Sequence, residues 1–520
     1  TAISEFWLEY AESFDKFNVS AIAKYLYENR EYESVSASGY NFNAQGVVNL
    51  GAVDPSTYSI GSYQQTEKAE NYFVNVDLDY DDKLIVSGMI RRDGSSSFGE
   101  EERYQTYYRG SLAYRITQDF DISNVQEWKV RASYGTSGQR PPFAAQYETF
   151  NVSASGISPN ILGNNAIKPS TVAELEVGTD LSFMDRFSFV ANYAVTNVEN
   201  DYLLVPLPPI AGYGAQWQNV GKIENKTLEF GLNGQLVNTK DVSWSFNVSW
   251  DKTSQMITDL GGPGFTLDAG GALALFRIEE GVSYGAMYGN IIATSLDQLT
   301  TDADGFVINY GSGLTLSDFE VNPDGYVIQA GTHGTADESV VYVFDEVSGE
   351  RLVGKIGDTN PDFKMGISTN YSYKGFGVYA LFDWVQGGDV YNYTKQLLYF
   401  NYRHEDLETY TNEGYHFNYM QGNSLYNLSD ANQHFVEDAS YVKLRELAFS
   451  YTLGQDKLGA LGQYVSDVKF SVIGRNLLTF TNYTGWDPEV ALRSNATNFR
   501  LDEYAYPNFR TFSASVQVRF

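Results

Sequence analysis

The sequence of 520 residues has no cysteine and only four histidines. The lack of thiols excludes disulfides, iron–sulfur clusters, cysteine-ligated zinc and thiol nucleophiles, and four histidines leave little for metal or acid–base chemistry. Basic residues are also scarce, because 35 Lys and Arg stand against 65 Asp and Glu and the net charge is −30. A chain so acidic is a poor match for DNA, RNA or anionic lipid, which bind basic faces. We therefore predict no nucleic-acid partner.

Long apolar runs are absent as well. No run of 18 apolar residues occurs, so the sequence predicts no transmembrane helix. The first residues do not read as a signal peptide, because they have no basic start and carry Glu5, Glu9 and Glu12. If the protein is exported, we expect its signal to lie upstream of Thr1.

What the sequence has in abundance is alternation with a period of two. Successive side chains of a β-strand point to opposite faces, so alternation makes one face apolar and the other polar. Between Val242 and Trp250, large apolar residues alternate with serine and asparagine, and Val74–Tyr80 repeats the pattern with asparagine and aspartate. Aromatic residues make up 15% of the chain. Helical periodicity is scarce, so we predict an all-β protein.

About fifteen such segments follow one another, near residues 1–13, 17–29, 69–80, 83–92, 104–117, 127–137, 170–183, 187–199, 226–237, 241–253, 362–373, 376–386, 440–453, 467–480 and 508–520. Short connections alternate with long ones, the longest being 254–361 and 387–439. This alternation is typical of a transmembrane antiparallel β-barrel with short periplasmic turns and long extracellular loops. A soluble sheet with one core face is the alternative, but it has no reason to place every long loop at one end.

Strand parity adds an expectation about the front of the chain. Bacterial barrels have even strand numbers, whereas the count here is odd and the first strand runs inward. We therefore expect an odd number of strands to precede Thr1. The apolar faces would meet lipid, and tyrosine and tryptophan near strand ends would form interface girdles, as at Tyr104, Tyr107, Tyr108, Trp128, Tyr371 and Tyr373.

Several segments of the sequence carry a family resemblance. In order they are Arg92–Gly99, Trp128–Gly135, Gly357–Phe363, Gly387–Asn392, Asp438–Leu447, Gly474–Thr479, Gly485–Glu489 and Tyr506–Thr511. Together they resemble the SusC/RagA class of TonB-dependent outer-membrane transporters of Bacteroidota. Residues 1–69 fit by pattern only. The glycines of Asp93-Gly94 and Gly387-Gly388-Asp389 permit turns with positive φ, so we interpret them as structural rather than ligand-binding.

The resemblance implies a barrel of about 22 strands, of which residues 1–520 would be the C-terminal portion. It implies an N-terminal plug and a TonB-contacting segment outside this chain. It also implies a SusD-like surface lipoprotein as lid, contact with outer-membrane lipid, and import of oligosaccharides or peptides. We predict no cofactor and no enzymatic activity. The rival interpretations are a passive porin or secretion-associated channel or scaffold, and a soluble β-rich binding protein or glycosidase.

Residues for the cargo and for barrel assembly can be named only as candidates. Aromatic rings in the long loops suit sugars and peptides, so we predict cargo contacts from Tyr213, Trp217, Tyr391, Tyr393 and Tyr402. The alternating apolar residues of the last strand resemble the signal that the outer-membrane assembly machinery reads, although they could equally be girdle residues. They are Phe512, Val516, Val518 and Phe520.

Other chemistry is disfavoured by spacing. Asp302–Gly305 and Asn322–Gly325 are not followed by the glutamate that an EF-hand requires, so ordinary turns are the better interpretation. His404, His416 and His434 are too widely spaced for a compact metal motif. There is no Gly-x-Ser-x-Gly nucleophile elbow, and Gly261–Gly264 lacks the lysine of a phosphate-binding loop. We predict no metal site and no catalytic residue.

Overall fold

The structure is a computed structural model that describes residues 1–153, 156–268, 273–310, 313–335, 337–405, 425, 427–489 and 500–520. The chain divides into two compact units. The first unit comprises Thr1–Asp121, Lys129–Val177 and Thr196–Lys222. The second comprises Ile122–Trp128, Gly178–Val195 and Ile223–Phe520. Each unit is described by itself below.

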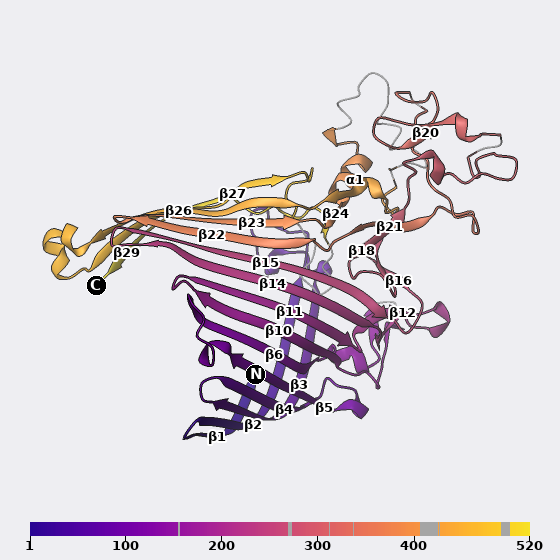
Figure 1. Cartoon of the computed structure of the whole chain (residues 1–520). Coiled ribbons are helices and arrows are strands. Elements are labelled where there is room, and N and C mark those ends of the chain that lie inside the picture. The colour runs from indigo at the N-terminus through magenta and orange to yellow at the C-terminus, as the bar shows by residue number, and fades with distance from the viewer. Residues whose placement is uncertain are drawn as a thin grey trace. The chain divides into compact units, whose positions relative to one another are not determined.

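The main element is a 15-stranded antiparallel sheet whose strands follow one another in chain order (Figure 1). Its members are β1 (Ala2–Phe14), β2 (Phe17–Ser38), β3 (Ser59–Tyr80), β4 (Leu84–Ser95), β5 (Tyr104–Arg115), β6 (Val125–Gln139), β10 (Ser170–Phe183), β11 (Phe187–Glu199), β14 (Lys222–Asn238), β15 (Val242–Asp259), β22 (Phe363–Tyr373), β23 (Phe376–Gln386), β26 (Tyr441–Gly454), β27 (Asp467–Thr481) and β29 (Thr511–Arg519).

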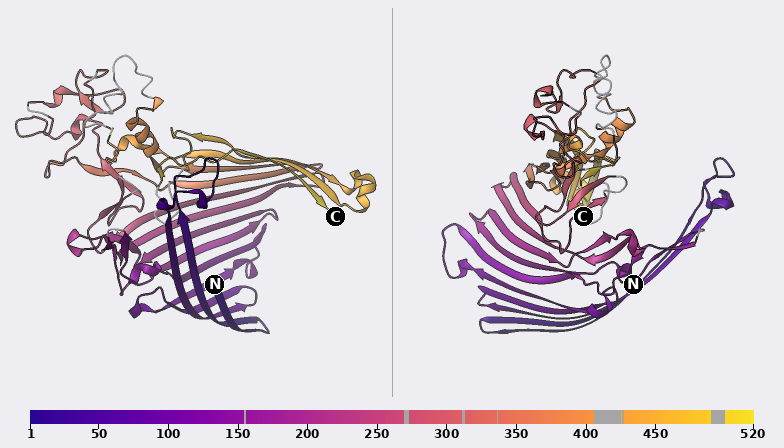
Figure 2. Two further views of the ribbon diagram at one scale, coloured as in Figure 1. Left: turned by 180° about the vertical axis from the view of Figure 1, so that it is seen from behind. Right: turned by 90° about the vertical axis from the view of Figure 1, so that its right-hand side faces the viewer.

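The fifteen predicted strands are therefore confirmed, and so is the alternation of short and long connections. Strands β10, β11 and β23 have the predicted bounds. The main error concerns β2 and β3, which were expected to end near residue 29 and begin near residue 69. Their ladder continues to the pair Ser38↔Ser59, because backbone pairing extends the hairpin beyond the apolar alternation. Figure 2 shows this long hairpin from two further sides.

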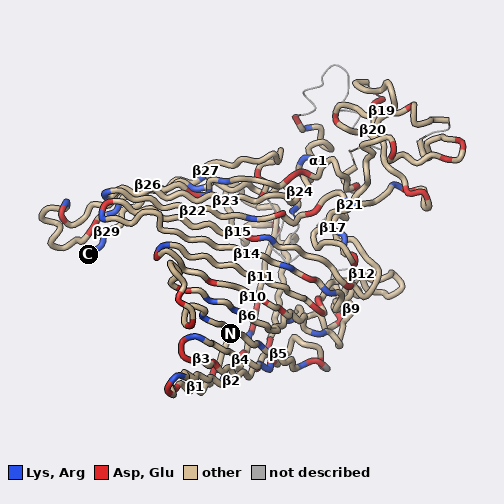
Figure 3. Tube along the Cα trace, in the orientation of Figure 1, with Lys and Arg blue, Asp and Glu red and all other residues tan. Residues whose placement is uncertain are grey.

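In the first unit, the opposite faces of the hairpins differ in chemistry. On β3 the apolar residues Val74 and Val76 are exposed, while Asn75 and Asp77 on the other face bond to each other at 2.7 Å. Exposed apolar side chains on one face and bonded polar ones on the other indicate a lipid-facing and an inner surface, respectively. Charged residues are rare on the strands of the second unit, as Figure 3 shows for β22 and β23, which are almost entirely uncharged.

The long connections contain their own small sheets. Strands β16 (Phe265–Asp268), β17 (Ala274–Ile278), β18 (Ala286–Asn290) and β21 (Val353–Asp358) form one, and β19 (Phe319–Val321) with β20 (Val327–Gln329) another. A third joins β25 (Val436–Asp438), β24 (Asp389–Asn392) and β28 (Leu501–Asp502). In the first unit the small strands are β7 (Phe150–Ser153), β8 (Gly156–Pro159), β9 (Ile161–Leu162), β12 (Tyr202–Pro206) and β13 (Ala215–Asn219).

Helix is scarce, as the sequence predicts. The α-helix α1 (Tyr393–Phe400) begins after Asn392, whose side chain accepts a hydrogen bond from the Lys395 amide at 2.8 Å. It packs beside a buried apolar cluster in the loops of the second unit that includes Leu275, Met287, Tyr391 and Phe435. Within the described residues, no helix has the length and hydropathy needed to cross a membrane.

Close packing on strand β14 generates the first prediction. A Cβ added to Gly234 would lie 2.4 Å from the Phe246 ring and 2.7 Å from that of Phe187, whereas a Cβ at Gly231 would meet nothing within 4 Å. We expect Gly234→Val to lower the free energy of unfolding by about 1–3 kcal/mol through overpacking. The matched control Gly231→Val should change it by less than about 0.5 kcal/mol. Urea unfolding of the full-length protein, followed by tryptophan fluorescence, measures both, and equal effects would contradict the packing assignment.

Candidate functional site

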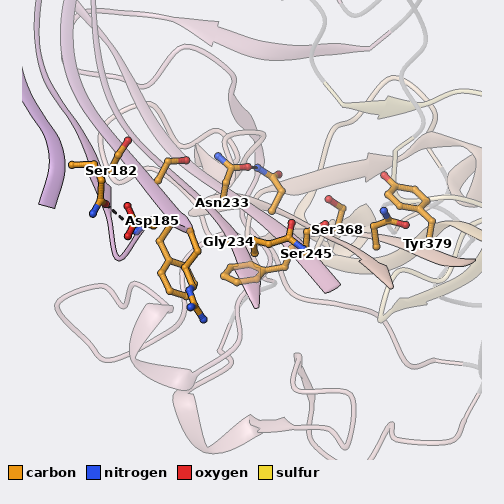
Figure 4. Close-up of a pocket in the computed structure, with 15 residues that line it drawn as sticks. Ser182, Asp185, Asn233, Gly234, Ser245, Ser368 and Tyr379 are labelled. Carbon is orange, nitrogen blue, oxygen red and sulfur yellow. Dashed lines mark hydrogen bonds between the residues drawn. The ribbon is translucent and has the colours of Figure 1, made fainter. Parts of the chain in front are cut away.

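A polar cavity of about 650 Å³ lies in the second unit (Figure 4). Its walls come from the consecutive strands β6, β10, β11, β14, β15, β22 and β23 and from the turn at Asp185–Arg186. The lining is dominated by hydroxyls and amides, among them Ser182, Asn233, Ser245, Ser368 and Tyr379. Such groups on alternate positions of each strand make a hydrated wall, as expected for the inner surface of a transport barrel.

The polar groups of this wall are partly engaged with one another. The Asn247 amide donates to the Asn233 carbonyl oxygen at 2.5 Å, and the backbone amide of Asp185 donates to Gln126 Oε1 at 3.0 Å. The rings of Phe187 and Phe246, 6.5 Å apart between centroids, lie on the opposite, apolar face of these strands. No nucleophile–base pair is formed by these residues, so the wall offers hydrogen bonding rather than covalent chemistry.

A cluster of charged residues lies on the same inner face further along β23. Asp383 shares its strand face with Tyr379 because the two positions differ by four residues. Arg445 on β26 donates to Asp383 from Nε at 3.0 Å and to Glu489 from Nη1 at 2.6 Å. Lys443 donates to Asp487 at 2.6 Å and also bonds Glu489. The cluster joins the connection after β27 to two strands of the sheet.

The charges of this cluster are wholly or partly buried, so each of them depends on its bonded partners. The side chains of Lys443 and Asp487 are only 3% and 9% exposed. Glu489 forms ion pairs with Lys443 and Arg445, and it also accepts a hydrogen bond from the Tyr441 hydroxyl at 2.9 Å. Burial alone would raise the pKa of Glu489, but hydrogen bonds from Arg445 and Lys443 and their charges outweigh it and lower the pKa to about 2. A buried charge that loses its partner costs about 3–5 kcal/mol.

The glycine-rich segments pack together at the base of the same loops. A Cβ at Gly387, whose φ is +74°, would lie 2.6 Å from Asp362 Oδ2, and a Cβ at Gly388 would lie 2.9 Å from the Thr359 carbonyl oxygen. The Asp389 carboxylate accepts from the Asp358 amide at 2.7 Å, and burial raises the pKa of Asp389. These glycines therefore allow two loop strands to approach closely, which is a structural role.

The first unit holds Tyr213 and Trp217 of the predicted cargo contacts. Trp217 lies on β13, with its ring 6.2 Å from that of Tyr202 in an edge-on arrangement. Tyr213 is half-buried; burial and then a hydrogen bond to Glu148 raise its pKa. Both rings are thus partly available at the surface of this unit, and their contact with cargo remains a prediction.

The second unit holds Tyr391, Tyr393 and Tyr402, which differ in exposure. Tyr391 has 0% exposed surface and donates its hydroxyl to Gln396 at 2.9 Å, so in this structure it is a packing residue. Tyr393 begins α1 and packs against the apolar cluster around Tyr391. Tyr402 is 46% exposed. These rings belong to one loop assembly, but of the three only Tyr402 is exposed.

Three of the predicted assembly residues share one face of β29, and the fourth, Phe520, follows the strand directly. Phe512, Val516, Val518 and Phe520 are 73%, 63%, 43% and 89% exposed. Val516 pairs with Phe470 and Val518 with Val468 on β27. An exposed apolar row of this kind suits a lipid-facing strand, and both the assembly role and the girdle role remain predictions.

The charged cluster is the feature that sequence reasoning missed. Its signal was visible, because Lys443 and Arg445 alternate with apolar residues in β26 and therefore share a face. What the sequence does not show is that Asp487 and Glu489 return to that face. No group of three or more histidine or acidic side chains suited to a metal ion occurs among the described residues. His416 lies outside the described residues, while Asp302 accepts from the amides of Asp304 and Phe306 in an ordinary turn.

Loss of Lys443 tests what holds the connection after β27. We expect Lys443→Met to speed hydrogen–deuterium exchange of amides 483–489 at least about tenfold, because Asp487 is left buried without its cation. Arg475→Gln is the matched control, since Arg475 pairs with Glu446 at 2.8 Å and is 50% exposed. Exposed pairs contribute about 0–1 kcal/mol, so exchange there should change less than about fivefold. Equal responses of the two variants would refute an anchoring role.

Acid should also weaken the contact between the connection after β27 and strand β26, which we call the attached state. Because the pKa of bound Glu489 is about 2 and its ordinary value is 4.5, ionisation stabilises the attached state by on the order of 3 kcal/mol. This contribution is complete above pH 4.5 and is lost as the pH falls toward 2. Protection factors of amides 483–489 should fall over that window and stay flat above it, whereas Glu489→Gln should remove this component of the pH dependence. Unchanged protection in wild type down to pH 2 would contradict the assignment.

Comparison with known proteins agrees with this geometry. Residues 6–331 match the family model described as TonB dependent receptor-like, beta-barrel. The chain is 29% identical to a TonB-dependent receptor of Formosa agariphila, over 100% of the chain and 52% of that protein. It is 22% identical to the TonB-dependent receptor SusC of Bacteroides thetaiotaomicron, over 88% of the chain and 44% of that protein.

Solved structures show the same fold. The RagAB peptide transporter matches with a TM-score of 0.75 at 19% identity, over 99% of this chain and 55% of that one. The chain spans about half the length of the curated relatives it matches. Since the family model covers more than half of the 520 residues, the chain belongs to the TonB dependent receptor-like β-barrel family, whose members are outer-membrane proteins.

Proposed function

We propose that the protein containing this barrel imports a nutrient across the outer membrane with energy delivered through TonB. The observation that carries the proposal is the alignment of the whole chain with a TonB-dependent receptor. The N-terminal plug and TonB-contacting segment belong to the proposed full-length protein. The barrel supplies the lipid-facing wall, the hydrated inner surface and the loops.

The cargo is proposed to be an oligosaccharide or a peptide, captured under a SusD-like lipoprotein lid. The resemblance of several strand and loop segments to the SusC/RagA class supports the lid, as does similarity to SusC itself. The fold shared with the RagAB peptide transporter is compatible with either cargo class. The hydroxyl and amide wall suits both, since sugars and peptides are rich in hydrogen-bonding groups.

The chain's side chains act by binding and positioning rather than by catalysis. Tyr213, Trp217, Tyr393 and Tyr402 are proposed to offer ring faces to cargo, with Tyr402 the most accessible of the loop set in the second unit. Tyr391 acts through packing, because its ring is fully buried. The charged cluster keeps the connection after β27 against the inner wall, so that the passage has a defined lining.

Uptake by cells distinguishes this proposal from a passive porin. Cells that produce the full-length protein should accumulate fluorescent oligosaccharide or peptide, and deletion of its gene should abolish accumulation of the correct cargo. Dissipation of the proton gradient, or deletion of the TonB system, should abolish accumulation equally, because transport is energised. Accumulation that depends on the gene but survives loss of TonB would establish the porin alternative.

A further inference from the structure

An arginine stands on the lipid-facing surface of the first unit. Arg92 on β4 lies on the same strand face as Ile90 and Val86, which are 55% and 39% exposed. The neighbouring Arg91 is on the opposite face and pairs with Asp93. An arginine among lipid-facing residues costs about 2–4 kcal/mol at the middle of the membrane and far less at its border. Its height on the wall therefore decides what it can do.

The strand register fixes that height. At the short-turn end, one cross-strand row runs Phe14, Phe17, Tyr80, Leu84 and Tyr114. Eight residues further along the strands, the row is Phe6, Tyr25, Tyr72, Arg92 and Thr106. Eight residues span about 27 Å along a strand and about 20 Å along the membrane normal at the usual tilt.

Aromatic rings mark both rows, as girdles mark the two borders of a membrane. We call the row that contains Arg92 the upper row, and in it the rings of Tyr25 and Tyr72 lie 4.9 Å apart between centroids. Short turns face the periplasm in this class of barrel, so the upper row lies at the outer leaflet. Arg92 is consequently placed at the depth of lipid headgroups.

A groove extends across the wall and covers two rows, that of Arg92 and the next one toward the short turns. The cavity has a volume of about 670 Å³ and includes Arg92 and Thr106 at its upper end. Phe6 and Tyr25 line it in the same row, and the next row toward the short turns contributes the apolar side chains of Leu8, Ala23, Val74 and Ile90. Ala23 leaves the space in its middle, because its neighbours across the ladder are the larger Leu8 and Val74.

The guanidinium of Arg92 is oriented by a ring and has no counter-ion among the side chains that the structure describes. It lies 5.3 Å from the centroid of the Tyr104 ring, a cation–π contact that fixes a cation without neutralising it. The nearby Glu70 carboxylate is engaged by the hydroxyls of Tyr104 and Tyr72, the latter at 3.4 Å. Among the described residues, no carboxylate lies within ion-pair distance of Arg92.

We propose that this groove binds one phosphate-bearing lipid of the outer leaflet, with the phosphate on Arg92 and an acyl chain along Leu8, Ala23 and Val74. The occupant must combine an anion with a long apolar chain, because the cation stands at the border of the lipid zone and the groove continues into it. Planar guanidinium is the side chain best matched to phosphate oxygens. The acidic composition of the chain argued against anionic lipid as a partner, and this one uncompensated arginine reverses that argument locally.

Native mass spectrometry of the full-length, delipidated protein in detergent tests the proposal. The probes are phosphatidic acid, diacylglycerol with the same acyl chains, and inorganic phosphate. We expect phosphatidic acid to bind at least about tenfold more tightly than either partial probe. Arg92→Gln should weaken phosphatidic acid about tenfold, which corresponds to about 1.4 kcal/mol, and leave diacylglycerol unchanged. Arg91→Gln is the matched control on the opposite face and should have no effect on binding.

The apolar half of the site needs its own variant. Ala23→Trp fills the groove and should displace phosphatidic acid and diacylglycerol alike, whereas Ala514→Trp on the lipid-facing side of β29 should displace neither. Retention of the SDS-resistant folded band in unheated gel samples shows that each variant is assembled. Equal lipid binding by wild type and Arg92→Gln would overturn the proposal. Binding of inorganic phosphate as tightly as phosphatidic acid would also overturn it. So would a change in the oligomeric mass of the Arg92→Gln or Ala23→Trp variant without loss of bound lipid.

Discussion

The backbone of a chain in lipid must satisfy its own hydrogen bonds, and this constraint organises the molecule. Within the hydrocarbon layer no water replaces a missing partner, so every strand must pair with neighbours on both sides. The fifteen strands pair in chain order, the thirteen from β2 to β27 each between two neighbours, and each hairpin needs only a short turn on one side. Pairing fixes the period of two, and the period fixes which side chains meet lipid and which meet water. The chemistry of the protein is therefore confined to alternate residues and to the loops.

Sequence reasoning succeeded where the structure depends on this local period. The bounds of β10, β11 and β23 follow from alternation alone, because each residue's face is set by its parity. The extension of β2 and β3 to Ser38↔Ser59 could not be foreseen, since backbone pairing there continues without an apolar face. Tyr391 shows the other limit: an aromatic residue in a long loop looked accessible, yet tertiary packing left it 0% exposed. Burial in loops depends on partners that are distant in sequence.

The family resemblance gains a physical basis from the loops. The segment with Lys443 and Arg445 and the segment with Asp487 and Glu489 are distant in the chain but form one charged cluster. Gly387 and Gly388 pack on the segment that contains Thr359 and Asp362. Each segment on its own is weak evidence for the family, because the contacts that explain its residues are made with another segment. This explains why the order of several segments was informative and why no single one was.

Arginine illustrates how the two faces of one sheet give the same side chain different roles. On the inner face Arg445 is bonded to Asp383 and Glu489, so its charge is neutralised by the carboxylates and helps to hold a loop. On the lipid-facing surface Arg92 contacts the Tyr104 ring and forms no ion pair with any described residue, so its charge remains to attract an anion. Residue type does not separate these cases, whereas strand parity and cross-strand register do. Because both can be traced residue by residue along a barrel wall, an uncompensated cation beside an aromatic girdle is a physical criterion for a lipid site.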